Sequence, residues 1–266
     1  MNPKLLRLKA IVREMESVLV AYSGGADSAF LARVAYDLLG AGAVAVTAVS
    51  PSFPSYELLE TERVAREIGI RHLLVKTDEL EDPSYRANQG NRCYFCKSEL
   101  YRVLKPKAVE LQLRHVANGT NCDDLQEVRH GLQAASEQEI RSPLVEAGLT
   151  KAELRELSRQ LGLSTADKPA LACLSSRFPP GTEVTEERLR RIDRIESGLA
   201  GLGFKRFRVR FHEPIARIEV DPNEIGRFVD PLLREKIAGL CRENGFIYAA
   251  LDLEGYRYGN VSQIRL

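Results

Sequence analysis

An apolar run enters a glycine turn and then an amphipathic helical pattern in Val18-Leu19-Val20-Ala21-Tyr22-Ser23-Gly24-Gly25-Ala26-Asp27-Ser28-Ala29-Phe30. Adjacent glycines let a backbone approach an anion closely, and the N–H groups of the following helix point their positive end at the same place. No Lys follows the glycines, so the turn is not a Walker loop. The pattern predicts a phosphate cradle, with phosphate contacts from Ser23, Gly24, Gly25, Asp27 and Ser28. The alternative is a tight strand-to-helix turn that Asp27 or Ser28 merely caps.

Composition favours a globular enzyme of one or two domains, because the 266 residues are 44% hydrophobic and 28% charged. No apolar run is long enough to predict a membrane span or a signal core. The five cysteines are an odd number, which argues against a disulfide framework and for a reducing cytoplasm. A net charge of only +1 predicts no electrostatic footprint for a nucleic-acid partner.

The first half alternates apolar strands with helical patterns, which predicts an α/β fold with a parallel sheet covered by helices on both faces. Expected strands are 18–22, 43–49, 71–76 and 114–118, and expected helices are 28–39, 56–68, 96–110 and 123–135. Three polar loops follow such strands: the glycine turn, the loop at 50–53, and the loop at 119–124. Ligands gather at the carboxyl ends of parallel strands, so we expect Gly119 and Thr120 to contact the same ligand as the glycine turn. Asp27 and Asp124 would supply hard oxygen ligands for Mg²⁺.

A smaller α+β domain is predicted for residues 171–266, after a first domain spanning 1–170. A capping-box pattern begins a helix at Thr150, and the Pro-rich segment 167–181 reads as a junction. Beyond it we expect helices at 185–202 and 222–244, and strands at 205–211, 215–220 and 246–251.

Cysteines carry the second chemical signal, with Cys93 and Cys96 in Arg-Cys-Tyr-Phe-Cys-Lys and Cys173 in Ala-Cys-Leu-Ser-Ser-Arg. A Cys-x-x-Cys pair lets two sulfurs reach one metal or each other. Three thiolates fit an open iron–sulfur cluster better than a four-ligand zinc site. A redox pair, or two unrelated thiols, is the alternative. We expect Cys241 to be a small buried hydrophobe. Cys122 is expected to have a packing role, and the alternative is a fourth cluster ligand.

Taken together, these motifs and the closing Leu-Asp-Leu-Glu-Gly-Tyr-Arg at 251–257 resemble the LarE family. That family belongs to the PP-loop ATP pyrophosphatases. Its members are ATP-dependent sulfur transferases that act in the biosynthesis of the nickel-pincer nucleotide. This nucleotide is the cofactor of lactate racemase. The resemblance implies a pyridinium dicarboxylate mononucleotide substrate whose carboxylates are adenylated and replaced by thiocarboxylates. It also implies a homo-oligomer and a sulfide or other sulfur donor.

Two variants of the family imply two roles for Cys173. In one, the corresponding cysteine gives up its own sulfur. In the other, three cysteines hold a 4Fe-4S cluster that carries a transferable sulfide, and the presence of Cys93 and Cys96 predicts that variant here. Lys97 and Arg177 flank the cysteines and would stabilise negative charge on the acyl phosphate and the carboxyl oxygen. Ser176 is a further candidate in the same motif.

Arg206, Arg208 and Arg210 are expected to point to one face of a strand, and guanidinium groups match the geometry of a phosphate. For Arg208 and Arg210 the family resemblance favours a substrate phosphate site over a solvated strand face. For Arg206 a solvated strand face is an equal alternative. Glu196 matches a polar active-site position of the family, although a helix-surface carboxylate explains it nearly as well.

Two other enzyme classes compete with this interpretation. A tRNA thiolation enzyme would need a basic surface or an RNA-binding domain, and neither is visible in the sequence. An amide-forming PP-loop ligase such as an NAD or GMP synthetase would need an ammonia source and leaves three placed cysteines unexplained. A nucleotide-binding regulator would have no need of adenylation machinery.

Overall fold

The computed structural model describes residues 2–126, 130–170 and 172–257. Two compact units are distinguished along the chain. The first comprises Met1–Ser50, Glu57–Tyr85 and Gly90–Leu171, and the second comprises Pro51–Tyr56, Arg86–Gln89 and Ala172–Leu266. Within the described residues no helix is long and apolar enough to cross a membrane.

A four-stranded parallel sheet organises the first unit, in the order β3-β2-β1-β4. Its strands are β1 (Val18–Ala21), β2 (Ala43–Val49), β3 (Arg71–Lys76) and β4 (His115–Asn118). The central strands β1 and β2 carry continuous apolar runs because both of their faces are buried, whereas the edge strand β3 is partly exposed. This confirms the predicted α/β class.

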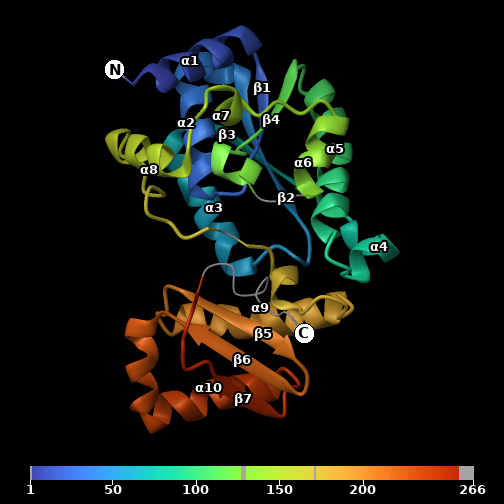
Figure 1. Ribbon diagram of the computed structural model, residues 1–266, viewed down its shortest axis with the longest axis vertical. Helices are drawn as coiled ribbons and strands as arrows, with labels where there is room; N and C mark the ends of the chain where they lie inside the picture. The colour runs from blue at the N-terminus through green and yellow to red at the C-terminus, as the bar shows by residue number, and fades with distance from the viewer. Residues whose placement is uncertain (1, 127–129, 171, 258–266) are drawn as a thin grey trace. The chain divides into compact units, whose positions relative to one another are not determined.

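Alternate residues of β1 show how the sheet is covered. Val18 and Val20 pack in one apolar cluster, whereas Leu19 packs in another on the opposite face. The first cluster is closed by α1 (Pro3–Met15), α2 (Ala26–Leu39), α3 (Ser55–Ile68), α7 (Pro143–Glu146) and α8 (Lys151–Gln160). The second is closed by α5 (Arg92–Glu110) and α6 (His130–Glu137). In Figure 1 the strands run between α2 and α8 on one side and α5 and α6 on the other.

Helix α8 begins as its sequence predicts. The Thr150 side chain accepts a hydrogen bond from the Glu153 backbone N–H, and the Glu153 carboxylate accepts one from the Thr150 N–H at 2.9 Å. This capping box satisfies two N–H donors that the helix itself leaves without partners. The remaining short elements of the unit are the 3₁₀ turns η1 (Gly40–Gly42), η2 (Glu79–Glu81) and η3 (Cys122–Gln126), and the helix α4 (Pro83–Arg86) at its boundary.

The helix predicted over 123–135 is wrong as one continuous element. Its first part is the 3₁₀ turn η3, its later part is α6, and residues 127–129 lie outside the described chain. Asn121 accounts for the turn, because its side chain accepts hydrogen bonds from the Asp123 and Asp124 N–H groups.

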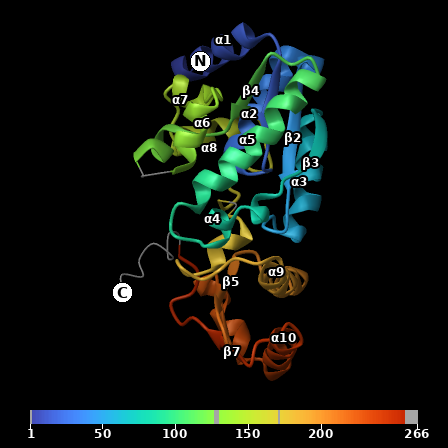
Figure 2. The same cartoon turned by 90° about the vertical axis from the view of Figure 1, so that its right-hand side faces the viewer.

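In the second unit, a three-stranded sheet in the order β5-β6-β7 lies against two helices. Strands β5 (Phe207–His212) and β6 (Ile215–Val220) pair antiparallel, and β7 (Tyr248–Leu251) pairs parallel with β6. Helices α9 (Glu186–Gly201) and α10 (Pro231–Glu243) cover one side of the sheet, as Figure 2 shows. The apolar face of α9 is fully buried, at Leu189, Ile192, Ile195 and Leu199.

A single helix over 222–244 is also wrong. The structure has a 3₁₀ segment, η5 (Pro222–Val229), followed by α10. Pro231 has no N–H and forces Asp230 out of the helical region, to φ −65° and ψ 117°. The Asp230 side chain then caps α10 by accepting a hydrogen bond from Leu232 N at 2.9 Å.

Candidate active site

The turn between β1 and α2 forms a compact cradle of backbone and hydroxyl groups. Ser28 Oγ accepts a hydrogen bond from Ser23 N and lies 3.2 Å from Ser23 Oγ. Gly25 is the N-cap of α2, and within the described chain no side chain caps this helix. The amide groups of its first turn are therefore directed at the cradle, where an anion would be stabilised.

Gly24 is required for the shape of this turn. Its φ is +71°, and a Cβ at this position would lie 2.4 Å from Thr61 Oγ1 of α3. The Thr61 hydroxyl donates to the Glu57 carbonyl at 2.8 Å and lies 3.4 Å from the Ser23 carbonyl, so α3 packs closely against the turn. Only glycine tolerates both the positive φ and the close approach.

Gly119, at the end of β4, meets the first turn of α2. A Cβ on Gly119 would lie 2.9 Å from Ser28 N. The next residue is fixed as well, because Thr120 N donates to Asn118 Oδ1 at 3.0 Å. The parallel register aligns Ala21 with Asn118, which brings these two loops to the same end of the sheet.

Asp27 and Asp124 form an acidic pair beside the cradle. Burial raises the pKa of the Asp27 carboxyl, with the Asp124 charge adding to this effect and Lys151 opposing it. Asn121 donates to Asp27 Oδ2 at 3.2 Å, whereas Asp27 Oδ1 is buried and has no hydrogen-bond partner among the described residues. A buried carboxylate oxygen of this kind calls for a cation or a proton, so the donor set fits a hard divalent ion.

Lys168 also reaches the cradle, although the sequence analysis did not select it. Its Nζ donates to the Gly24 carbonyl at 3.2 Å and pairs with Glu57 Oε2 at 2.8 Å. The Lys168 side chain is only 14% exposed. Lys168 and Gly24 are 144 positions apart, so no local pattern in the sequence could have signalled this contact.

Cys93, Cys96 and Lys97 lie on the first turns of α5. The two cysteines are three residues apart on a helix and therefore lie on one side of it. Cys93 is exposed and Cys96 is half-buried. The Lys97 ammonium lies 6.0 Å from the centroid of the Tyr101 ring, and α6 packs against its stem at Gly131. The helix predicted over 96–110 thus begins earlier, at Arg92, so that Cys93 lies on it as well as Cys96.

Cys173, in the second unit, immediately precedes the 3₁₀ turn η4 (Leu174–Arg177) and is half-buried. Its carbonyl oxygen accepts three hydrogen bonds, from Ser176 Oγ at 2.7 Å, Ser176 N at 3.0 Å and Arg177 Nη1 at 2.9 Å. Leu174 N donates to the Ser52 carbonyl at 2.8 Å. The backbone around the Cys173 thiol is therefore held rigidly.

Arg177 and Glu196 form a fully buried, bidentate ion pair with distances of 2.9 and 2.7 Å. Burial would lower the pKa of the Arg177 guanidinium, but the Glu196 carboxylate raises it. Burial would likewise raise the pKa of Glu196, but Arg177 lowers it. Glu196 also accepts from Val209 N at 2.9 Å and from Tyr56 Oη at 3.2 Å. The alternative of a helix-surface carboxylate is wrong, because Glu196 is 0% exposed.

Arg208 and Arg210 lie on β5. Arg210 pairs with the buried Glu219 at 2.9 Å and donates to the Ser176 carbonyl at 3.1 Å, so it contacts the Cys173 turn. Burial lowers the pKa of Arg208, and the Arg177 charge lowers it further. The Arg208 guanidinium lies 5.1 Å from the centroid of the Tyr256 ring. Arg208 is therefore a half-buried cation, and a guanidinium in this position can bind an anion through charge-assisted hydrogen bonds.

The other three candidate positions are less specialised. Arg206 is half-exposed and lies 3.7 Å from Asp221, which is typical of a surface ion pair. Cys241 is buried on α10, and burial raises the pKa of its thiol to about 11. Cys122 in η3 is half-buried, with its sulfur 4.0 Å from the Val145 carbonyl.

A group of three or more His, Cys, Asp or Glu side chains able to hold a metal ion does not occur among the described residues. Cys93 and Cys96 belong to the first unit and Cys173 to the second.

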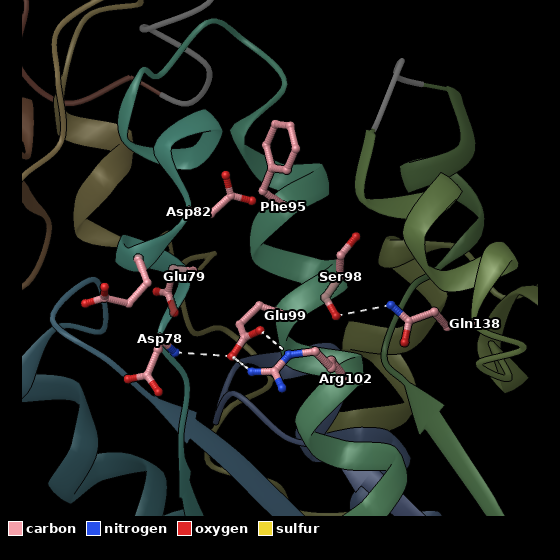
Figure 3. Close-up of a pocket in the computed structure, with 9 residues that line it drawn as sticks. Asp78, Glu79, Asp82, Phe95, Ser98, Glu99, Arg102 and Gln138 are labelled. Atoms are coloured by element: carbon pink, nitrogen blue, oxygen red, sulfur yellow. Dashed lines mark hydrogen bonds and ion pairs between the residues drawn. The ribbon is translucent and has the colours of Figure 1, made fainter.

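Separate from the cradle, the first unit has an open cavity of about 570 Å³ (Figure 3). Its lining includes the carboxylates of Asp78, Glu79, Glu81, Asp82 and Glu99 and the guanidinium of Arg102. Glu99 accepts from Arg102 and from Asp78 N in this view. Five carboxylates against one guanidinium would repel a polyphosphate, so the cradle suits ATP better than this cavity does.

Comparison with known proteins places the chain in a family. No protein-family model matches it. It is 47% identical over 264 residues to an uncharacterized protein of Synechocystis, covering 99% of this chain and 98% of the relative. It is 27% identical over 257 residues to an uncharacterized protein of Methanocaldococcus jannaschii, covering 96% and 97%. It is 35% identical over 260 residues to the pyridinium-3,5-bisthiocarboxylic acid mononucleotide synthase of Lactiplantibacillus plantarum, covering 97% and 94%. Because the 35% identity to this synthase extends over nearly the whole of both chains, the chain belongs to the LarE family.

Proposed function

We propose that this protein is an ATP-dependent sulfur transferase of nickel-pincer cofactor biosynthesis. Its substrate would be pyridinium-3,5-biscarboxylic acid mononucleotide, whose carboxylates it converts to thiocarboxylates. The observation that supports the proposal most directly is the 35% identity, over 97% of this chain, to a synthase named for the bisthiocarboxylic acid product. The cradle and the rigid Cys173 turn are the features that such a reaction needs.

Activation is the first step, because a carboxylate repels nucleophiles and has no good leaving group. A carboxylate oxygen of the substrate attacks the α-phosphorus of ATP and pyrophosphate leaves, which yields an acyl adenylate. Ser23, Gly24, Gly25 and Ser28 bind the phosphates, and Gly119 and Thr120 contact the nucleotide. Mg²⁺, held by Asp27 and Asp124, would neutralise phosphate charge. Asp27 Oδ1, which has no hydrogen-bond partner among the described residues, supports that assignment.

Sulfur transfer is the second step. A sulfur nucleophile attacks the acyl carbon, a C–S bond forms, and AMP leaves with the electron pair of the broken C–O bond. If the nucleophile is the Cys173 thiolate, loss of the Cα proton then breaks the Cys173 Cβ–S bond, which leaves dehydroalanine and a thiocarboxylate.

The source of sulfur that the cysteine pattern predicts is instead a 4Fe-4S cluster, for which Cys93, Cys96 and Cys173 would be the thiolate ligands. Thiolates are the donors that such clusters prefer, and each of these cysteines is at least partly exposed. The cluster would supply a transferable sulfide and allow repeated turnover, with sulfide or another donor restoring it.

Hydrogen bonds in the second unit indicate which residues hold the Cys173 turn in place. Arg177 contacts Glu196 and the carbonyls of the Cys173 turn, so we assign it to holding that turn rather than to direct contact with the acyl phosphate. Ser176 serves the same turn. Lys97 stays assigned to the developing negative charge, and Arg208 and Arg210 to the substrate phosphate.

The test is iron and acid-labile sulfide content, with the visible spectrum, on protein purified without oxygen. About four irons per chain, lost in the Cys93/Cys96/Cys173 triple variant, would support the cluster. No iron after anaerobic reconstitution, with loss of one sulfur from the protein after ATP and substrate, would assign the sulfur to Cys173.

The competing enzyme classes give different results. ATP-dependent activity that is unchanged in Cys173→Ala would contradict sulfur transfer through Cys173 and favour an amide-forming ligase. Co-purifying RNA with salt-sensitive binding would favour tRNA thiolation instead.

A further inference from the structure

We propose that Lys168 is an ATP-binding residue that contacts the distal phosphates at the cradle. This inference deepens the proposed function, because it assigns a further residue to its nucleotide site. It starts from the 3.2 Å hydrogen bond between Lys168 Nζ and the carbonyl of Gly24, a residue of the cradle itself.

The location of the ammonium supports binding of an anion. Lys168 and Glu57 are only 14% and 18% exposed, so solvent screens the Lys168 charge weakly. Electrostatic attraction of this ammonium to a polyphosphate is likewise weakly screened, and the Glu57 carboxylate at 2.8 Å offsets part of its charge. A lysine ammonium has three N–H donors, and within the described chain Lys168 Nζ contacts two acceptors, Gly24 and Glu57. One donor therefore remains for a phosphate oxygen.

The backbone on either side of the contact is fixed. Lys168 N donates to the Thr165 carbonyl at 3.0 Å in the turn that follows α8. In a trans peptide the C=O of one residue points opposite to the N–H of the next. Because Lys168 holds the Gly24 carbonyl, it also directs the Gly25 N–H away from itself, toward the other side of the turn. Lys168 would thus both orient the cradle and add a positive charge to it.

Glu57 provides the means of testing these two roles separately. It lies on the first turn of α3 and pairs with the same ammonium. Glu57→Gln removes the ion pair but keeps the Lys168 charge and an amide oxygen that can accept its hydrogen bond. Lys168→Met removes the charge and keeps most of the side-chain volume.

The experiment is calorimetric titration of the full chain with ATP, inorganic pyrophosphate and AMP, in the absence of the pyridinium substrate. Lys168→Met should weaken ATP and pyrophosphate binding by roughly tenfold or more, the worth of a charge-assisted hydrogen bond. AMP binding should be unchanged, because AMP lacks the distal phosphates. Lys168→Arg should recover part of the loss. Glu57→Gln should bind ATP at least as tightly as the unaltered protein.

Lys4→Met is the matched control, since it breaks another lysine–glutamate pair of the first unit, with Glu153 at 2.7 Å. It should leave all three affinities unchanged. Equal losses for ATP and AMP in Lys168→Met, or the same ATP loss in Glu57→Gln, would assign Lys168 to structure alone and overturn the proposal.

These results are independent of sulfur chemistry. A negative result for Lys168 would leave the sulfur-transfer proposal standing, and an ATP-specific loss would support Lys168 even in a protein that transfers no sulfur. Absence of nucleotide binding by the unaltered protein would overturn both.

Discussion

The Arg177 guanidinium faces the Glu196 carboxylate in a bidentate ion pair, and both side chains are 0% exposed. The same guanidinium donates to the Ala172 and Cys173 carbonyls at 2.8 and 2.9 Å. A buried pair therefore links α9 to the turn that carries the candidate sulfur donor. Removing one partner would leave a charge buried without its counterion.

Arg177→Met should lower the free energy of unfolding by about 3 to 5 kcal/mol, because Glu196 would remain charged and buried. Arg190→Met is the control on α9, the helix that carries Glu196, since it removes an exposed pair with Glu186 and should cost below about 1 kcal/mol. Urea titration followed by circular dichroism measures both. Replacing both partners, as in Arg177→Met with Glu196→Leu, should recover much of the loss. Equal costs for Arg177→Met and Arg190→Met would contradict the central role of the buried pair.

Gly24→Ala should destabilise the first unit and abolish ATP binding. The positive φ alone costs about 1 to 2 kcal/mol for a residue with a Cβ, and the new Cβ would also lie 2.4 Å from Thr61 Oγ1. Gly162→Ala isolates the first contribution, since Gly162 has φ +69° and its Cβ would meet nothing within 4 Å. Chemical denaturation should show a larger loss for Gly24→Ala. If the two variants are equally stable, the contact with Thr61 does not constrain the turn.

Asp27→Asn should remove most of the tightening of ATP binding by Mg²⁺. The carboxylate provides a buried oxygen without a hydrogen-bond partner in the described chain, and an amide is a weaker ligand for a hard cation. Asp123→Asn is the control, because Asp123 lies in the same turn η3 but accepts a hydrogen bond from Lys151 N, at the start of α8, at 2.8 Å. ATP affinity would be measured in Mg²⁺ and in EDTA. An undiminished effect of Mg²⁺ in Asp27→Asn would exclude Asp27 as a ligand.

His72 should make the protein less stable in mild acid. Burial lowers the pKa of its imidazole, although the Glu62 charge opposes the shift, and Nε2 lies 2.8 Å from Thr47 Oγ1. The unfolded chain, with a His pKa of about 6.5, then binds the proton more readily than the folded one. This contribution to stability is complete above the unfolded pKa and is lost as the pH falls through the folded pKa.

His72→Gln should flatten this dependence, because glutamine keeps a donor for Thr47 and does not titrate. Unfolding free energies measured by urea titration between roughly pH 5 and 7 would show the difference. A slope that survives the substitution would have to come from other groups.

Local patterns in the sequence determined much of the first unit. Periodicity and turn chemistry reveal features that depend on neighbours a few residues apart. In this unit these features are the strand at 18–21, the glycine turn, helix α2 and the capping box at Thr150. The same holds for the parallel α/β class. The failures at 123–135 and 222–244 arose where a single side chain or a proline overrode a helical pattern, at Asn121 and Pro231.

Pairing between distant residues was decided only by the tertiary structure. Glu196 carries no mark in the sequence of its burial against Arg177, 19 positions away, and Lys168 none of its contact with Gly24 across 144 positions. From the sequence alone a charged side chain is predicted to be exposed, because burying a charge costs free energy unless a partner offsets it. Only the fold brings such a partner close, and it thereby decides which roles Arg177, Glu196 and Lys168 can take.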